Sequence, residues 1–346
     1  MKRQMQRLSG MVVLLALTAA SVYSQENQKL AQSGFQFLSV VSDARGAGMA
    51  EAMTSLETGS SALFFNPAGM AHMTEKVDIT ASTNQWIADI THNTFSMALC
   101  PGGGEYGVFG FSVQSVNYGT FFGTRVDKNT DLGYANTGTF ELSSLAVGGG
   151  YAKRLNDRFS VGGQVRWVRQ DLGESVIPKV VQVEDSTGAM VQDTVGQTVG
   201  NELTPLAFDF GTQFKTGFKS LVFGMSVRNF SKEIKYVEEG FQLPLVFNLG
   251  ISMNVMDFFD EQGLDQSLYV SVDASHYRSH AEQIKIGADY RLLEILSLRA
   301  GYMTASDENG MTFGLGVHYA GATVDYAYTP YGVFDKVQRM TARFSL

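Results

Sequence analysis

The last third of the chain alternates apolar and polar residues in segments of about ten, and turn residues separate the segments. In residues 338–346 the two kinds take alternate positions: Met340, Ala342, Phe344 and Leu346 against Arg339, Thr341, Arg343 and Ser345. Because successive side chains of a strand point to opposite faces, one row would contact lipid and the other a polar interior. The pattern is typical of a transmembrane β-barrel. A soluble β-sandwich also alternates and is the alternative.

The amino terminus favours the membrane protein. Lys2, Arg3 and Arg7 precede an apolar run from Met11 to Ala20, and a signal peptidase would cleave before Gln25. We therefore expect a cleaved signal peptide over residues 1–24. The apolar run is shorter than the roughly 18 residues that a membrane-spanning helix needs, and no later stretch reaches that length. Insertion into a membrane would therefore use strands.

Residues 76–346 contain about fourteen strand-like segments, which is within the range of outer-membrane barrels. An even number closes an antiparallel sheet without free edges. The sequence therefore predicts an all-β fold, a transmembrane antiparallel barrel, in residues 76–346. Residues 25–75 would form a separate N-terminal segment.

Charged residues in these strands occupy the row opposite the apolar one. A charge on the lipid face costs roughly 2 to 4 kcal/mol at the membrane midplane, so these side chains should face the lumen. We expect oppositely charged members to pair across neighbouring strands. The lumen charges are Arg166, Asp209, Arg228, Asp273, Lys285, Asp289, Arg299, Asp325 and Arg343. The lipid-facing row is illustrated by Met311, Phe313, Leu315 and Val317.

Two long connections, near residues 117–139 and 171–203, both follow odd-numbered segments, whereas the connections after even-numbered segments are short. In outer-membrane barrels the long loops are extracellular and the short turns periplasmic. This parity predicts a periplasmic mature amino terminus. Apolar loop residues would be available to protein partners: Tyr118, Phe121, Phe122, Val176 and Ile177.

Residues 25–75 lack sustained strand periodicity and are rich in glycine and alanine. Small residues permit close backbone approach, so this segment could fold inside the lumen as a plug. We expect its contacts to involve Asp43 and Arg45, and the turn formed by Asn66, Pro67 and Ala68. The alternative is a disordered periplasmic tail, which the apolar residues in the segment argue against.

Several motifs resemble those of the PorV/PorQ family and, more distantly, of FadL-type barrels. In the N-terminal segment they are Asp43-Ala44-Arg45 before a glycine-rich run and Ser61 to Gly69. In the strands they are Ala207 to Gly211 with Lys215-Thr216-Gly217, Val227 to Phe230, Leu243-Pro244-Leu245, Leu298 to Tyr302 and the closing Arg343 to Leu346. The resemblance covers nearly the whole mature chain.

This resemblance implies a fourteen-stranded FadL-like barrel in the outer membrane of a Gram-negative bacterium, associated with type IX secretion. PorV-like members escort cargo, and PorQ-like members are structural parts of the attachment complex. The implied partners are outer-membrane lipid and cargo or secretion-machinery proteins. The alternative is a FadL-like passage for small hydrophobic molecules, with the plug as its gate.

Enzymatic, cofactor, metal and nucleic-acid functions find little support in the sequence. The net charge is −8, which argues against a nucleic-acid partner. The glycine-rich run from Gly102 to Gly107 precedes a strand rather than a phosphate-binding helix. Asp127, Asn129 and Asp131 lack the glycine and the glutamate of a calcium loop, and the five histidines are dispersed. We expect a protein that is not an enzyme and has no cofactor and no metal site.

Overall fold

The structure is a computed structural model, and it describes residues 33–126, 130–184, 190–236, 239–259, 265–279, 281–305, 310–334 and 336–346. The predicted signal peptide and residues 25–32 lie outside the described residues, as do Asp127 and Asn129. Among the described residues, no helix is both long and apolar enough to span a bilayer.

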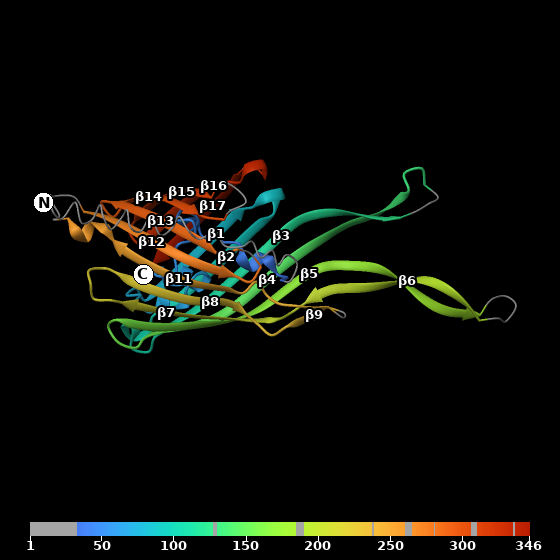
Figure 1. Cartoon of the computed structure of the whole chain (residues 1–346), viewed down its shortest axis with the longest axis horizontal. Coiled ribbons are helices and arrows are strands. Elements are labelled where there is room, and N and C mark those ends of the chain that lie inside the picture. The colour runs from blue at the N-terminus through green and yellow to red at the C-terminus, as the bar shows by residue number, and fades with distance from the viewer. Residues whose placement is uncertain are drawn as a thin grey trace.

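Strands dominate the chain and join into one large antiparallel sheet that closes on itself (Figure 1). The strands are β1 (Val77–Gln85), β2 (Thr91–Leu99), β3 (Val108–Val126), β4 (Tyr134–Arg154), β5 (Phe159–Glu184), β6 (Met190–Leu203), β7 (Leu206–Lys215), β8 (Val222–Phe230), β9 (Ile234–Tyr236), β10 (Glu239–Phe241), β11 (Val246–Asn254), β12 (Gln266–Tyr277), β13 (Gln283–Leu292), β14 (Leu296–Met303), β15 (Met311–Tyr319), β16 (Ala322–Pro330) and β17 (Lys336–Ser345).

The first and last strands close the barrel. β1 pairs antiparallel with β17, and Val77 and Leu346 exchange backbone hydrogen bonds of 3.0 and 2.9 Å. β6 pairs only with the outer part of β5, and β9 and β10 form a separate two-stranded sheet. The other strands form a closed ring of 14, which confirms the predicted antiparallel barrel.

The alternation of side chains sorts the barrel into two faces. On β15, Met311, Phe313, Leu315 and Val317 are exposed on the outside, whereas Thr312 is buried inside. The same alternation buries Asp273, Lys285 and Asp289 on their strands. The outer apolar surface matches a hydrocarbon environment, and the interior is polar.

The two predicted long loops are largely strand, which corrects the expected boundaries. β3 and β4 pair as far as Val126 and Tyr134, and β5 pairs with β6 as far as Glu184 and Met190. These two hairpins project beyond the other strands at one end of the barrel, which we call the hairpin end (Figure 1). The opposite end, with the turns that precede β3, β5 and β8, is the turn end.

Short helices occur in the N-terminal segment, which we define as residues 33–75, and in a few turns. They are η1 (Gln36–Ser39), α2 (Ala44–Gly48), η2 (Gly59–Phe64), η3 (Pro67–Met70), η4 (Ile87–Asp89), η5 (Pro101–Gly104), η6 (Val255–Phe258) and η7 (Gly332–Phe334). Most residues of the segment are buried.

The N-terminal segment runs from the hairpin end to the turn end. Ser33 forms a bridge with Gln242 near β10, and Phe35 and Phe37 pack against Val116 and Val168. At the other end of the segment, the Met73 carbonyl lies 3.4 Å from Cys100 Sγ beside the turn after β2. The described part of the segment therefore begins at the hairpin end, and the mature amino terminus, for which loop parity predicts the periplasmic side, lies outside the described residues.

Candidate functional site

The candidate site is the contact between the N-terminal segment and the barrel wall. Glycines of the wall allow the backbone of the segment to pack directly against the backbone of the strands. A Cβ on Gly301 would lie 2.4 Å from the Ala50 nitrogen, and one on Gly287 would lie 2.6 Å from the Met49 carbonyl oxygen. Gly287 and Gly301 are partners on β13 and β14, so they form a flat area of wall beneath the segment. Larger side chains would hold the segment away from the wall.

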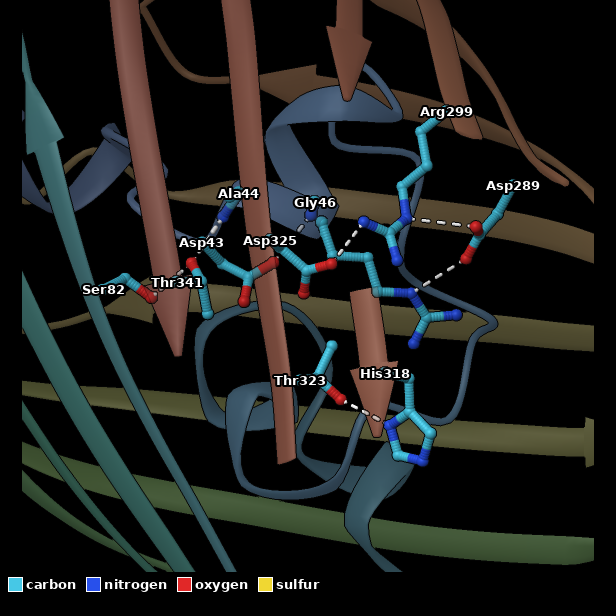
Figure 2. A network of polar contacts seen from close by, with 11 residues as sticks. Asp43, Ala44, Gly46, Ser82, Asp289, Arg299, His318, Thr323, Asp325 and Thr341 are labelled. Carbon is cyan, nitrogen blue, oxygen red and sulfur yellow. Dashed lines mark hydrogen bonds and ion pairs between the residues drawn. The ribbon is translucent and has the colours of Figure 1, made fainter. Parts of the chain in front are cut away.

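Asp43 begins the short helix α2 and connects it to the wall (Figure 2). Its side chain accepts a hydrogen bond of 2.6 Å from the Gly46 nitrogen, which satisfies a free N–H of the first turn. The Ala44 nitrogen donates to Thr341 Oγ1 at 2.8 Å. Burial raises the pKa of Asp43 above its ordinary value, and the hydrogen bond from Gly46 opposes that shift.

Arg45 joins a row of alternating charges whose other members lie on three strands of the wall. Its Nε lies 3.1 Å from Asp289 on β13, and Asp289 also accepts from Arg299 on β14 at 3.1 Å. Arg299 then donates to Asp325 on β16 at 2.6 Å (Figure 2). Asp289 and Arg299 are direct cross-strand partners. Each buried charge in this row has an opposite charge beside it, which offsets the cost of removing the charges from water.

A second group of polar contacts fixes the residues after α2. Lys285 donates to Glu51 and to the Tyr277 hydroxyl, both at 2.7 Å. Burial disfavours ionised Glu51, but the Lys285 ammonium outweighs that effect and lowers the pKa of Glu51. Asp273 accepts from the Thr54 nitrogen at 2.9 Å. These contacts join the segment to β12 and β13.

The Asn66 turn is held against a different part of the wall. Asn66 Oδ1 accepts from the Ala68 nitrogen at 3.1 Å, and Nδ2 donates to the Thr54 and Thr212 carbonyls at 2.7 and 3.0 Å. Pro67 begins η3 and lies against Gly162 of β5. A Cβ added to Gly162 would be 2.5 Å from the carbonyl carbon of Pro67. One amide thus binds its own turn, the preceding loop and β7.

The remaining lumen charges lie on two sides of the barrel. Arg166 donates to Asp209 at 2.8 Å and to Asn229 at 2.5 Å, where the pairing of β7 with β8 shifts register. Arg343 binds Asp78 at 2.6 Å, which joins β17 to β1. Arg228 is partly buried and lines a small cavity beside Glu51. His318 Nδ1 lies 2.7 Å from Thr323 Oγ1, within hydrogen-bonding distance.

The loop candidates divide into exposed and packed residues. Phe122 is 76% exposed on β3, and Phe121 stacks on Phe140 with centroids 5.6 Å apart. Tyr118 is half-buried, packs against the apolar cluster of Phe35 and Phe37, and its hydroxyl lies 3.0 Å from Ser144 Oγ. The side chains of Val176 and Ile177 lie outside the described residues.

Several residues of this site were not singled out from the sequence. Thr312 and Thr341 bind the segment backbone, and Gly287 and Gly301 make room for it. Their only sequence signal is position, because small residues recur in the inward row of consecutive strands. In the described part of the chain, no three His, Cys, Asp or Glu side chains gather as a metal site.

A closed fourteen-stranded barrel with a polar interior and an apolar outside defines the chain as a barrel of the bacterial outer-membrane type with the FadL-like fold. The chain belongs to the family of the type IX secretion system protein PorV, whose family model matches residues 23–274. No curated protein sequence matches it.

Solved structures share the fold at low sequence identity. The toluene transporter TodX of Pseudomonas putida aligns with a TM-score of 0.56 at 13% identity, covering 87% of this chain and 96% of TodX. The toluene transporter TbuX of Ralstonia pickettii aligns with a TM-score of 0.54 at 12% identity, covering 87% of this chain and 96% of TbuX. A FadL homologue of Pseudomonas aeruginosa aligns with a TM-score of 0.52 at 13% identity, covering 88% of this chain and 98% of the homologue.

Proposed function

We propose that this chain is a protein-interaction component of type IX secretion, exported by a cleaved signal peptide to the outer membrane of a Gram-negative bacterium. It would bind cargo or secretion-machinery proteins through its two hairpins, which would face outward, and it would act as a binding protein rather than an enzyme. The family match over residues 23–274 carries the proposal.

We propose that the N-terminal segment plugs the barrel. Gly211 has no room for a Cβ, which would lie 1.8 Å from Asn66 Oδ1, so the turn and β7 are in direct contact. Around the middle of the segment, two cavities have volumes of about 20 and 70 Å³, and a third of about 400 Å³ lies at the turn end. The two smaller cavities are lined by charged and polar residues such as Arg228, Lys285 and Arg339. A lumen filled in this way favours partner binding over free passage.

The hairpins supply the surface that a protein partner would contact. β5 has 26 residues and β1 has nine. At about 3.3 Å per residue, β5 is far longer than an apolar band of about 25 Å requires. The projecting parts carry exposed apolar side chains, among them Phe122, Leu132 and Tyr134. Exposed aromatic residues outside the lipid zone are typical of protein-binding surfaces.

Shortening each hairpin tests this function. Thr120 pairs with Glu141 and Ser175 pairs with Val199, so an Asn-Gly turn can replace residues 121–140 or 176–198 in register. We expect each variant to remain a heat-modifiable barrel in the outer membrane and to lose secretion of surface-anchored cargo. A glycine inserted after Asp157, in the turn between β4 and β5, serves as the control.

A second candidate is the passage of small hydrophobic molecules. Two cavities of about 470 and 440 Å³ lie at the hairpin end; Leu206 and Phe208, from the outward row of β7, line the larger, and Phe241 lines the other. The fold is shared with the toluene transporters TodX and TbuX. Toluene uptake should therefore be measured on the same shortened variants. Intact secretion with lost uptake would assign the chain to this second function.

A further inference from the structure

The turn end of the lumen contains a cavity of about 400 Å³ with an excess of positive charge. The cations that line it are Arg45, Lys215, Lys219, Arg291 and Arg343, and Glu57 is the carboxylate among the lining residues. They come from the N-terminal segment, β7, the turn before β8, β13 and β17. Residues from such distant parts of the chain converge here only because the barrel closes.

Three of the cations are neutralised by neighbouring carboxylates. Arg45 binds Asp289, Arg343 binds Asp78 and Lys215 binds Glu57 at 2.6 Å. These contacts use one carboxylate for each cation.

The other two cations, Lys219 and Arg291, form no ion pair with a carboxylate of the described residues. Lys219 donates to the backbone oxygen of Asp257 at 2.8 Å and has no ion pair within the described part of the chain. The Asp257 carboxylate accepts instead from the Ser220 nitrogen at 2.9 Å. Arg291 has no ion pair among the residues that the structure describes. Lys219 and Arg291 line the same concave site, and the Asp289 carboxylate that acts on Arg291 already binds Arg45 and Arg299, so positive charge is in excess there and attracts an anion.

We propose that this cavity binds a small molecule carrying phosphate groups, with Arg291 and Lys219 as its principal contacts. Guanidinium forks bind phosphate oxygens in pairs, and the Tyr269 and Ser220 side chains in the lining add hydroxyl groups. The volume is within the range of small-ligand pockets and suits a molecule rather than a folded partner. This proposal does not depend on the secretion role.

The barrel purified in an uncharged detergent should be titrated calorimetrically with inorganic pyrophosphate. We expect saturable binding at one site that weakens as salt is added. Arg291→Gln and Lys219→Gln should each weaken it by about tenfold or more, since each removes a charged hydrogen bond. Neither residue has an ion-pair partner among the described residues, so the variants should remain heat-modifiable barrels. Arg154→Gln, an exposed arginine at the same end outside the cavity, should bind as the wild type does.

Absence of saturable binding, or equal losses in Arg291→Gln and Arg154→Gln, would overturn the proposal. A parallel titration with penta-glutamate distinguishes an acidic protein segment, and tighter binding of that peptide than of pyrophosphate would also overturn it. Repeating the pyrophosphate titration in nanodiscs of phosphatidylcholine, with and without phosphatidylglycerol, separates the two sources of phosphate. Competition by phosphatidylglycerol would show that the group belongs to a lipid head, and no competition would support a free ligand.

Discussion

Arg45 Nε lies 3.1 Å from Asp289 Oδ2, an ion pair between residues 244 positions apart in the sequence. Asp289 is almost completely buried, and Arg299 shares it from the other side. Separating a buried ion pair is costly, because each charge that stays buried loses an opposite charge. This contact therefore makes the position of the N-terminal segment depend on the barrel wall.

Asp289→Asn should loosen the segment while the barrel remains folded. Breaking a buried ion pair costs about 3 kcal/mol or more, which corresponds to about a hundredfold change in an opening equilibrium. Amide hydrogen exchange in residues 44–50 should therefore be about a hundredfold faster, as measured by mass spectrometry. Glu294→Gln, in the exposed turn between β13 and β14, should leave exchange unchanged. Equal exchange in both variants would show that the ion pair does not hold the segment.

Gly301→Ala should destabilise the protein by about 1 to 3 kcal/mol, because the new methyl group would collide with the Ala50 nitrogen. Gly149 is the matched control, since it lies on the outer face of β4 and has no heavy atom within 4 Å of an added Cβ. The free energy of unfolding in urea should be unchanged or slightly higher in Gly149→Ala. If both variants unfold alike, the segment does not rest on this part of the wall.

Glu51 should make stability depend on acid pH. Its pKa in the folded protein is below the ordinary value of 4.5, so its contribution is present above that pH and is lost as the pH falls through the folded pKa. Glu51→Gln should be less stable than wild type at pH 7, and the difference should shrink below about pH 4.5. Urea unfolding at pH 7, 5 and 3.5 measures this. A stability difference between Glu51→Gln and wild type that is the same at all three pH values would contradict this expectation. Glu105→Gln, at an exposed position, is the control.

Strand positions inside the membrane could be predicted because the two faces of each strand meet different solvents. Phe313 and Leu315 face outward and Thr312 inward, as their alternation indicates. The hairpins could not be predicted in this way. Around Phe122 and Tyr134 both faces of the strand are largely exposed, so the alternation that identifies a membrane strand disappears.

The contacts of the N-terminal segment were only partly predictable. The bond from Asn66 to the Ala68 nitrogen is local, and local turn chemistry can be anticipated from sequence. The pairing of Arg45 with Asp289 depends on barrel closure and on the path of the segment. Loop parity indicates the side on which strands end, but it carries no information about where Ser33 contacts the barrel, which is beside Gln242 at the hairpin end.

The central claim, that the hairpins bind secretion partners, is tested most directly by crosslinking in cells. A photo-crosslinking amino acid should replace Phe122 and, as the control, the lipid-facing Phe313, which is also exposed. The account predicts that position 122 forms an adduct with a type IX cargo or machinery protein identified by mass spectrometry. Position 313 should form no such adduct. Absence of a type IX protein at position 122, in a barrel that is folded and in the outer membrane, would contradict the account.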